Sequence, residues 1–448
     1  MGGGAARMRK SGKANKTGRL EDAEIEVLIS DIGGRGDGIA LSPSGVERVF
    51  VPLTVPGDRV RVRIVGRSGE GARGEVSAWL ERGAESVNPV CRHFGVCGGC
   101  ALQHLAPAAE RAWKRRHLVE QLRRAGIDCA DSVVEPVAAI APGERRRASF
   151  MFHCSGGVVA AGFNPRMSHR VVDLEECPAM LSVLAAKLPA LRRGLARILK
   201  EGQSLDGMAT ALEGGVDLLL TGPLEMSLEM REGLAALAED ADLARLSWRR
   251  AERESPEPVA HRRSAVIRFG GVAVEPPYGG FLQPSAAGER LLVERVVEET
   301  KRMKEGVWVA DLFSGCGTFA FSLARRFKVS AVENDAAAVA SAGRAASGVG
   351  GAVVVVQRDL FSNPLTALEL ARFEAVIFDP PRAGALAQAR ELARSRVPIV
   401  VAASCNPMTF ARDARLLVDG GYRLTGVLPV DQFPWSPHLE LMASFVRS

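Results

Sequence analysis

The sequence predicts a multidomain protein that begins with a small all-β barrel, continues through a mixed α+β domain and ends in a doubly wound α/β domain. Residues 20–82 alternate short apolar runs with Gly, Pro and Asp, which is typical of the short strands of a barrel. From about residue 285 onward, strand-like and helix-like segments alternate, which predicts a parallel sheet covered by helices. The chain of 448 residues is long enough for about three domains.

Four segments are therefore predicted. Residues 1–19 form a basic tail without the apolar stretch of a secretory signal. Residues 20–82 form the barrel, residues 83–284 the middle domain and residues 285–448 the α/β domain. No apolar run reaches the ~18 residues that a membrane span needs. We therefore expect a cytoplasmic protein, a monomer, with no membrane partner.

The barrel and the charge both favour nucleic acid as a partner. A five-stranded barrel of the OB type often binds oligonucleotides, although many small barrels do not. The net charge is +6, and basic residues gather at 111–116, 123–126, 144–150, 247–253 and 261–264. Any single cluster is equally well explained as a solvated surface. Five clusters together favour an anionic macromolecule.

The eight cysteines predict a metal site in a reducing compartment, where structural disulfides are rare. Three of them are spaced C-x5-C-x2-C, and a fourth lies in the segment LEECP; these are Cys91, Cys97, Cys100 and Cys177. Four thiolates can hold an iron–sulfur cluster or a zinc ion, and the spacing leaves both open. Cys129 and Cys154 lie in unpatterned segments, and we interpret both as ordinary.

The α/β domain is predicted to contain seven strands. They are expected at 307–313, 329–333, 352–357, 374–379, 398–404, 422–430 and 438–446. The last two are joined by a short link without a helix. We therefore expect them to form a hairpin, so that one edge strand runs antiparallel to the rest.

A cofactor site is predicted where the first of these strands ends. In the segment ADLFSGCGTF, Gly315 and Gly317 let the backbone approach a ligand, and Glu333 at the end of the next strand suits the two hydroxyls of a ribose. The D-x-x-x-G-x-G turn with this Glu favours S-adenosylmethionine over NAD. Asp359 and Asp379 follow later strands on the same rim, where Asp359 could reach the adenine amino group.

The motif Asp379-Pro-Pro-Arg382 limits the chemistry. Methyltransferases that act on amino groups carry an aromatic residue at the fourth position, where it stacks on the flipped base. An Arg there argues against methylation of an exocyclic amine.

Two further residues suggest a covalent mechanism. Cys405 follows the apolar run PIVVAAS and precedes a helix-like segment, and Glu440 stands where the last strand begins. Carbon 5 of a pyrimidine becomes nucleophilic only after a thiolate adds to C6, and a base must later remove the C5 proton. Cys405 fits the thiolate and Glu440 fits the base. A lone cysteine is more often an inert core residue, but the neighbouring motifs favour the reactive role.

In their order along the chain, these motifs resemble the RNA 5-methyluridine methyltransferase family, the RumA/TrmA type, and especially its bacterial 23S rRNA members. The motifs are DLFSGCGTFAF (311–321), AVEND (331–335), FDPPRAG (378–384), SCNPMTFARD (404–413) and DQFPWSPHLE (431–440). FLQPS (281–285), VCRHFGVCGGCALQHL (90–105) and GFNPRMSHRVVDLEECP (162–178) also match. The resemblance covers roughly residues 20 to 448.

The resemblance implies methylation of uridine C5 in RNA, with Cys405 as nucleophile and Glu440 as base. It implies that the barrel is a TRAM domain and that the last domain is a Rossmann-like class I methyltransferase. It also implies S-adenosylmethionine contacts at Gln283, Phe313, Glu333 and Asp379. The rRNA-type members favour a 4Fe–4S cluster, structural or in contact with RNA, on Cys91, Cys97, Cys100 and Cys177.

Three alternatives stay open. The substrate could be tRNA, although the tRNA-specific branch typically lacks both the barrel and the cysteine set. The chain could be a non-catalytic RNA-binding protein, against which Cys405 and Glu440 argue, or a cytosine-C5 methyltransferase, which would place its cysteine in another motif. The chain also departs from common family residues at Ser314, Thr318 and Ala345, so a cofactor contact from Thr318 is not implied.

Overall fold

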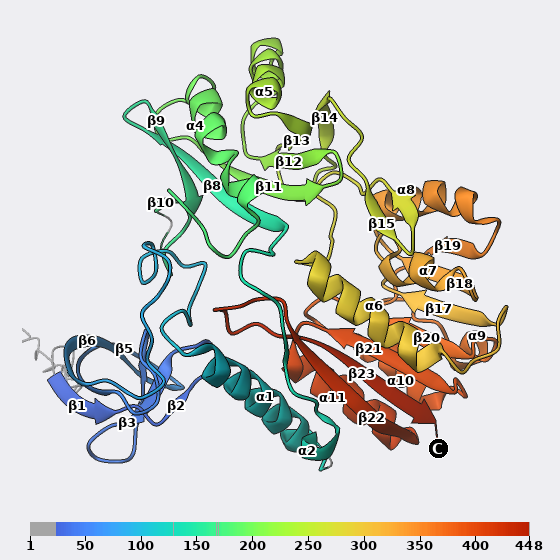
Figure 1. The fold of residues 1–448 in the computed structure, drawn as a ribbon, viewed down its shortest axis with the longest axis horizontal. Helices are drawn as coiled ribbons and strands as arrows, with labels where there is room; N and C mark the ends of the chain where they lie inside the picture. Colours follow the sequence, from blue (N-terminus) through green and yellow to red (C-terminus); the bar gives the residue numbers. More distant parts are fainter. Residues whose placement is uncertain (1–23, 129, 167, 169, 448) are drawn as a thin grey trace, which may run out of the picture. The chain divides into compact units, whose positions relative to one another are not determined.

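The computed structural model describes residues 24–447 except 129, 167 and 169, and it divides into two compact units (Figure 1). The first unit is Met1–Ser86 and the second is Val87–Ser448. The basic tail predicted for residues 1–19 and the interpretation of Cys129 lie outside the described residues.

The first unit is a sheet that closes on itself. Its strands are β1 (Glu24–Leu28), β2 (Asp31–Ile32), β3 (Gly38–Leu41), β4 (Arg48–Val51), β5 (Arg59–Ser68) and β6 (Gly71–Glu81). The order is β1-β5-β6-β4-β3-β2, with β4 and β6 parallel and the other pairs antiparallel. Since β1 and β2 are successive parts of one stretch, the sheet closes as a five-stranded Greek-key barrel.

Strand β5 explains how the sequence fills this barrel. Its residues read RVRVRI, and burial alternates with them: Val60, Val62 and Ile64 are buried, whereas Arg59 and Arg63 are not. A strand points successive side chains to opposite faces, so this period of two places Val60, Val62 and Ile64 inside. The alternation in sequence therefore encodes the core of the barrel directly.

The second unit begins with a seven-stranded sheet. Its strands are β8 (Arg147–Ser155), β9 (Val158–Phe163), β10 (Val172–Asp173), β11 (Ser204–Leu212), β12 (Gly215–Thr221), β13 (Leu243–Arg249) and β14 (Glu257–His261). The order is β10-β9-β8-β11-β12-β13-β14, and only β12 and β13 are parallel. The helices α3 (Ser182–Ala185), α4 (Leu188–Ala196) and α5 (Leu228–Asp240) belong to this part, and α4 and α5 share its hydrophobic core.

An eight-stranded sheet forms the rest of the second unit. It consists of β19 (Val353–Gln357), β18 (Lys328–Glu333), β17 (Trp308–Leu312), β20 (Ala375–Phe378), β21 (Ile399–Ser404), β23 (Glu440–Arg447), β22 (Tyr422–Asp431) and β7 (Ala138–Ala139), in this order. All seven strands predicted after residue 285 are present. A separate hairpin, β15 (Ile267–Phe269) and β16 (Val272–Val274), packs on the same core.

The last two strands correct one expectation. They do form a hairpin, and β23 runs antiparallel to both of its neighbours. However, β23 lies between β21 and β22 rather than at an edge. The edge is instead the two-residue strand β7, which pairs with Val430 and Asp431 at the end of β22.

Helices cover both faces of the eight-stranded sheet (Figure 1). On one face lie α1 (Pro107–Arg124), α9 (Ala367–Leu370), α10 (Leu386–Arg394) and α11 (Pro407–Asp419); on the other lie α6 (Ala286–Thr300), α7 (Thr318–Leu323) and α8 (Ala336–Ala346). Short α2 (Ala130–Val133) and η1 (Ser347–Val349) complete the helices of the described residues. No helix of these residues is long and apolar enough to cross a membrane.

Helix α1 belongs to this sheet although the sequence places it in the middle domain. Its side chains Leu118, Val119 and Leu122 are buried in the core with strands β20 to β23. The segment 107–139 therefore contributes a helix and the edge strand β7 to the same layer structure as residues 285–448.

Candidate active site

The site begins at the turn between β17 and α7. Phe313, Gly315 and Gly317 have positive φ angles of 58°, 54° and 100°. At Gly317 a side chain would also collide, because an added Cβ would lie 2.5 Å from the Phe321 ring. The turn therefore bends the backbone tightly at the carboxyl end of β17, where open α/β sheets bind their ligands.

Glu333 closes over this turn from the end of β18. Its carboxylate accepts hydrogen bonds from the backbone N–H groups of Gly315 at 2.9 Å, Asn334 at 2.8 Å and Asp335 at 2.9 Å. An ionised carboxylate has about four acceptor positions, so it keeps acceptor capacity for a ligand. The structure thus joins the predicted glycine turn and the predicted acid.

Two polar atoms of the same turn have no partner. Asp311 is fully buried; its Oδ2 accepts a hydrogen bond from the Ala320 N–H at 2.8 Å, but its Oδ1 has none. The hydroxyl of Ser314 is also buried without a partner. Burial, with Asp379 and Glu333 nearby, raises the pKa of Asp311 well above its usual range. Sequence reasoning assigned no role to either residue, although the D-x-x-S pattern contains both.

Asp359 lies in the loop after β19. Its carboxylate accepts hydrogen bonds from the Phe361 N–H at 2.9 Å and from the Ser362 hydroxyl at 2.7 Å, which lower its pKa. The Phe361 ring is 48% exposed and lies 5.5 Å from the Phe313 ring, centroid to centroid. A half-exposed aromatic ring next to an acid suits the flat face and amino group of a purine.

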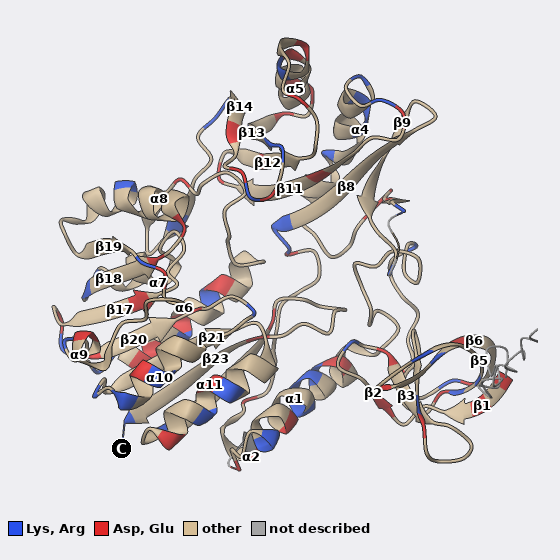
Figure 2. Ribbon diagram, turned by 180° about the vertical axis from the view of Figure 1, so that it is seen from behind, with Lys and Arg blue, Asp and Glu red and all other residues tan. Residues whose placement is uncertain are grey.

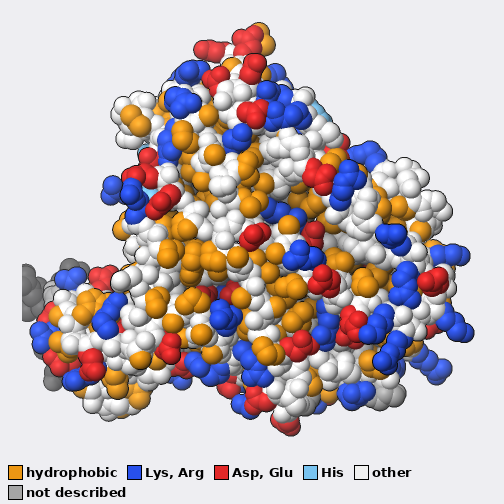
Figure 3. Space-filling view, viewed as in Figure 1, with side chains coloured by type: hydrophobic (Ala, Val, Ile, Leu, Met, Phe, Trp, Pro, Cys, Tyr) orange, Lys and Arg blue, Asp and Glu red, His pale blue; other side chains and the backbone are white. Residues whose placement is uncertain are grey.

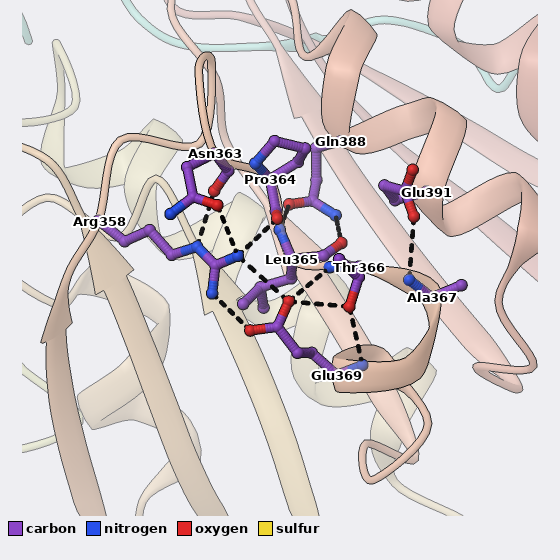
Figure 4. Close-up of polar contacts among 9 residues, drawn as sticks. All are labelled: Arg358, Asn363, Pro364, Leu365, Thr366, Ala367, Glu369, Gln388 and Glu391. Carbon is purple, nitrogen blue, oxygen red and sulfur yellow. Dashed lines mark hydrogen bonds and ion pairs between the residues drawn. The ribbon is translucent and has the colours of Figure 1, made fainter.

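Arg358 ties this loop down (Figure 4). Its guanidinium donates to the Glu369 carboxylate at 2.6 Å and to the carbonyls of Asn363 and Pro364 at 2.7 and 2.6 Å. Thr366 and Glu369 form a capping box at the start of α9, and Arg358 with this cap lowers the pKa of Glu369 to about 2. Because these contacts converge on the planar guanidinium of Arg358, the loop that carries Asp359 is fixed at both of its ends.

The second part of the site lies where β20, β21 and β23 meet. Cys405 follows the last residue of β21, and Glu440 is the first residue of β23. The antiparallel register pairs Ser404 with Leu441, and one further step places Cys405 opposite Glu440. Directly opposed residues of an antiparallel pair have Cβ atoms about 4.5–5.5 Å apart. Asp379 ends the neighbouring strand β20, so all three reach one rim.

The local sequence explains why Cys405 stands at this rim. Asn406 caps helix α11, since its side-chain oxygen accepts a hydrogen bond from the Met408 N–H at 3.1 Å, and Pro407 occupies the first helical position. The cap ends the strand and starts the helix within two residues. Cys405 is therefore left half-buried rather than packed inside the sheet.

The site is buried and rich in acidic groups. Burial raises the pKa of Asp379 to about 7, although a hydrogen bond from the Gln283 amide opposes this. Burial, followed by the neighbouring Asp379, raises the pKa of Glu440 well above its usual range. Burial, Glu440 and Asp379 raise the pKa of the Cys405 thiol to about 11, against the charge of Arg382. Cys405 is therefore a neutral thiol at pH 7 without substrate.

Gln283 connects two sides of the site. Its amide nitrogen donates to Asp379 at 2.8 Å, and its amide oxygen accepts a hydrogen bond from Gln432 at 3.0 Å. Both glutamine side chains are buried. Gln432 lies in the connection between β22 and β23, so this connection contacts the site although its sequence was interpreted only around Glu440.

Arg382 and His438 face each other at the outer edge of the site. An Nη of Arg382 lies 3.0 Å from Nδ1 of His438. Burial and the charge of Arg382 lower the pKa of His438, which favours neutral imidazole. Sequence reasoning used Arg382 only to exclude amine methylation, yet its charge is the one that favours a thiolate at Cys405.

The four predicted metal cysteines gather in one place. Each pair among Cys91, Cys97, Cys100 and Cys177 interacts electrostatically. Burial first, and then these neighbours, raise the pKa values of three of them, that of Cys100 to about 11. The Gly99 N–H donates to Cys97 Sγ at 3.4 Å. Cys154 lies elsewhere, buried in the core of the seven-stranded sheet.

The described part of the chain contains no group of three or more His, Cys, Asp or Glu side chains arranged to hold a metal ion as it stands. The four thiols therefore share one neighbourhood without converging on one point. Their donor chemistry nevertheless fits a thiophilic centre, since four sulfurs with N–H donors nearby are what iron–sulfur and zinc sites use.

Two of the basic clusters of the sequence contain arginines that are engaged in ion pairs within the fold. Arg146 is buried in an ion pair with Glu289, and Arg262 and Arg263 both pair with Asp242. Helix α1 carries both signs of charge (Figure 2). On the face of the second unit in Figure 3, Lys and Arg side chains are spread among acidic and apolar ones. These clusters are thus weaker indicators of an RNA surface than their sequence suggested.

The sheet order and the rim define the class of protein: the fold is that of an S-adenosylmethionine-dependent methyltransferase with additional domains. The tRNA (uracil-54, C5)-methyltransferase of Pyrococcus abyssi, solved with S-adenosyl-L-homocysteine, matches with a TM-score of 0.70 at 22% identity, over 94% of this chain and 99% of that one. The family model tRNA (Uracil-5-)-methyltransferase matches residues 352–446.

Sequence relatives extend over nearly the whole chain. An uncharacterised RNA methyltransferase of Brucella suis is 42% identical over 94% of this chain and 98% of its own length. The 23S rRNA (uracil(1939)-C(5))-methyltransferase RlmD of Halomonas elongata is 34% identical over 93% of this chain and 88% of its own. The chain belongs to the RNA uracil-C5 methyltransferase family, and it is an RNA (uracil-C5)-methyltransferase.

Proposed function

We propose that this enzyme methylates C5 of a uridine in 23S rRNA through a covalent bond between Cys405 and C6 of the base. The observation that carries the proposal is the register of β21 and β23: it ends with Ser404 paired to Leu441, and its continuation by one residue would set Cys405 opposite Glu440, beside Asp379. Addition at C6 requires a nucleophile, and proton removal at C5 requires a base that reaches the same ring. Two neighbouring side chains on one rim meet both requirements.

The reaction proceeds in balanced steps. Cys405 loses its proton to solvent as its sulfur adds to C6, and the π electrons of the C5–C6 bond move toward the O4 carbonyl to form an enolate. C5 then takes a methyl group, which S-adenosylmethionine supplies when bound. Glu440, as the carboxylate, removes the C5 proton, the C5–C6 double bond re-forms, and the Cys405 sulfur leaves as a thiolate and takes a proton from solvent; Glu440 then releases the C5 proton to solvent. The uridine must be flipped from its stack to reach this rim.

The protonation of the site fits this order of steps. Asp379 and Glu440 are buried, and the charge of Asp379 adds to the burial that raises the pKa of Glu440, so the site disfavours a second negative charge. A neutral Cys405 thiol in the free enzyme is protected from other electrophiles. The approach of a uracil ring displaces water and allows Arg382 to stabilise the negative charge that develops.

S-adenosylmethionine fits the glycine turn. The unpartnered Asp311 Oδ1 and Ser314 hydroxyl are buried polar atoms in the turn that a polar ligand would satisfy. Gln283, Phe313, Gly315, Glu333, Asp359 and Asp379 are the residues that we propose hold it. Glu333 would accept from the ribose hydroxyls, and Asp359 would accept from the adenine amino group, with Phe361 beside the ring.

Replacing Arg358 by Met should weaken the binding of S-adenosylhomocysteine about tenfold, or ~1.4 kcal/mol. The substitution removes the fork that fixes the loop carrying Asp359 and Phe361, so the loop must be ordered when the ligand binds. Titration calorimetry measures this. Arg390→Met on the exposed surface of α10 is the matched control and should bind normally. Equal affinities for both variants would show that Arg358 does not shape the site.

We further propose that Cys91, Cys97, Cys100 and Cys177 hold a 4Fe–4S cluster. The mutual electrostatic contact of the four thiols supports a single site, and the N–H donors near Cys97 and Cys177 support bound sulfur. The cluster would cross-link the segment of residues 91–100 to Cys177, which lies far along the chain. Zinc remains the alternative for the same four ligands.

Protein purified without oxygen should be brown and contain about four iron atoms and four sulfides per chain, since a 4Fe–4S cluster has that composition. Cys177→Ser should lose the colour and iron. Cys129→Ser is the control and should keep both. Colourless protein with one zinc per chain would instead establish the alternative.

The barrel and two arginines support RNA as the substrate. The barrel of the first unit would be a TRAM domain of the OB type, which grips single-stranded nucleic acid. In the second unit, Arg145 and Arg147 have no ion pair among the described residues. Burial, followed by the charges of Arg146 and Arg145, lowers the pKa of Arg147 to about 10. Two uncompensated cations near Gln283 suit the phosphates that flank a flipped base.

A substrate comparison tests the choice of RNA. The enzyme should methylate 23S rRNA fragments from a strain lacking this gene and leave tRNA from the same strain unmodified, as measured by 5-methyluridine in nuclease digests. The similarity to RlmD favours rRNA. Methylation of tRNA alone would establish the alternative, for which the fold of the Pyrococcus enzyme is the precedent.

A further inference from the structure

A buried lysine lies at the centre of the contacts between α1 and the connection from β22 to β23. Lys114 is 1% exposed, and its Nζ lies 2.7 Å from both carboxylate oxygens of Asp431, 2.8 Å from Glu110 Oε1 and 3.1 Å from the Phe433 carbonyl oxygen. An ammonium group has three protons to donate, so all of them are used. The contact joins residues 317 positions apart in the chain.

Two further contacts hold the same connection. The Trp435 N–H donates to Glu110 at 2.8 Å, and the Trp435 carbonyl accepts from the N–H groups of Ala101 and Leu102 at 2.8 and 2.9 Å. Trp435 has a φ of 64°, a strained conformation for a side chain of this size. Such strain persists where the surroundings over-determine the backbone, and it is typical of functional segments.

The connection thus held is the one that delivers two groups to the active site. Gln432 donates to Gln283, which in turn donates to Asp379. Glu440 follows at the end of the connection, where it pairs with Val430 across the hairpin. Lys114 therefore contacts Asp431 and Phe433, where the connection from β22 to the proposed base begins.

A buried ion pair is poor support for a purely stabilising role. Taking charges from water costs about as much as their attraction returns, and apolar residues of similar volume often stabilise a fold equally well. Charged groups do, however, fix one geometry, because a lysine with three bonded partners has a single satisfactory arrangement. The network therefore suits a role in fixing the position of the connection between β22 and β23 better than a role in stabilising the fold.

We propose that Lys114 is a positioning residue for the proton-removal step: it fixes the connection after Asp431 so that Glu440 faces the C5 proton of the base bound to Cys405. The inference rests on the proposed covalent mechanism. Helix α1 carries no residue of the reaction itself. The inference gives it a role in the proton-removal step and none in the binding of cofactor or RNA.

Lys114→Met should lower the steady-state rate about 10- to 100-fold, part of the 10²–10⁴-fold contribution of a well-placed base. It should also raise the fraction of enzyme found as a denaturant-stable RNA–protein adduct, because addition and methyl transfer still occur. The affinity for RNA should stay within about twofold, and that for S-adenosylhomocysteine should fall far less than the rate, because Gln283 keeps its own hydrogen bond to Asp379. Arg123→Met removes the same charge from the exposed surface of α1 and should match the wild type.

Asp431→Asn is the second variant, and it decides by the same criteria if Lys114→Met does not fold. It keeps the shape of the side chain and leaves Lys114 bonded to Glu110 and Phe433, so a smaller adduct signal is expected. The inference is overturned if the tested variant is slower but accumulates no adduct, or if its rate equals that of Arg123→Met. Either outcome counts only when Glu440→Gln still traps the adduct. If Glu440→Gln itself traps none, the proposed base is wrong and the inference falls with it.

Discussion

Replacing Cys405 by Ala should lower RNA methylation by more than about 10³-fold, because no other group at the rim can add to C6. The affinity for S-adenosylhomocysteine should stay within about twofold, since Cys405 acts on the base and not on the cofactor. Methyl transfer from radiolabelled cofactor and calorimetry measure the two quantities. Cys154→Ala, in the core of the seven-stranded sheet, is the control and should remain active.

The adduct gives a second readout for Cys405. RNA with 5-fluorouridine at the target should form a stable covalent complex with the wild-type enzyme, because fluorine cannot leave as a proton does. Cys405→Ala should form none. Since the pKa of the Cys405 thiol is raised to about 11, alkylation of the free enzyme by iodoacetamide should be slow at pH 7.5 and should accelerate as the pH rises toward that value. Absence of adduct with wild-type enzyme would refute the covalent mechanism.

Glu440→Gln should lower turnover about 10²- to 10⁴-fold, the usual contribution of a general base. Addition and methyl transfer precede proton removal, so they should continue until each enzyme molecule is occupied. The variant should therefore accumulate a denaturant-stable RNA–protein adduct that carries the transferred methyl group, visible as a radiolabelled band of raised mass.

Asp379→Asn separates this effect from damage to the site in general. It removes a carboxylate from the same rim, but one that we place at the cofactor, so it should weaken cofactor binding and accumulate no methylated adduct. If Glu440→Gln turns over at the wild-type rate, another group on the rim, or water, removes the proton.

The strands of the eight-stranded sheet could be predicted because each is a short apolar run bounded by polar or glycine-rich segments. The position of β23 could not. Sequence periodicity fixes which residues form a strand, but the order of strands depends on tertiary packing. Strand β7 was equally inaccessible, because two alanines carry no periodic signal and their pairing with β22 depends on where α1 packs.

The candidate site shows the same division. Cys405 and Glu333 could be found because each stands at the end of an apolar run, and Glu440 because it stands where one begins; the structure places Cys405 and Glu440 on one rim. Lys114 and Arg358 could not, because a lone basic residue in a helix or loop looks like surface until its partners are known. The same holds for two members of the basic runs, because Arg146 and Arg263 pair with acids that the sequence does not connect to them.

The edge strand β7 has a consequence for the order of folding during synthesis. Ala138 pairs with Val430, so the growing chain must lengthen by roughly 290 residues before this edge can form, a very non-local contact. Until then the apolar side of α1 has no complete partner and is a target for chaperones or for aggregation. The barrel of the first unit makes only local pairings and can close soon after it emerges from the ribosome. A nascent chain of this enzyme is therefore prone to aggregation for most of its synthesis, and the exposed segment is the one that contains α1.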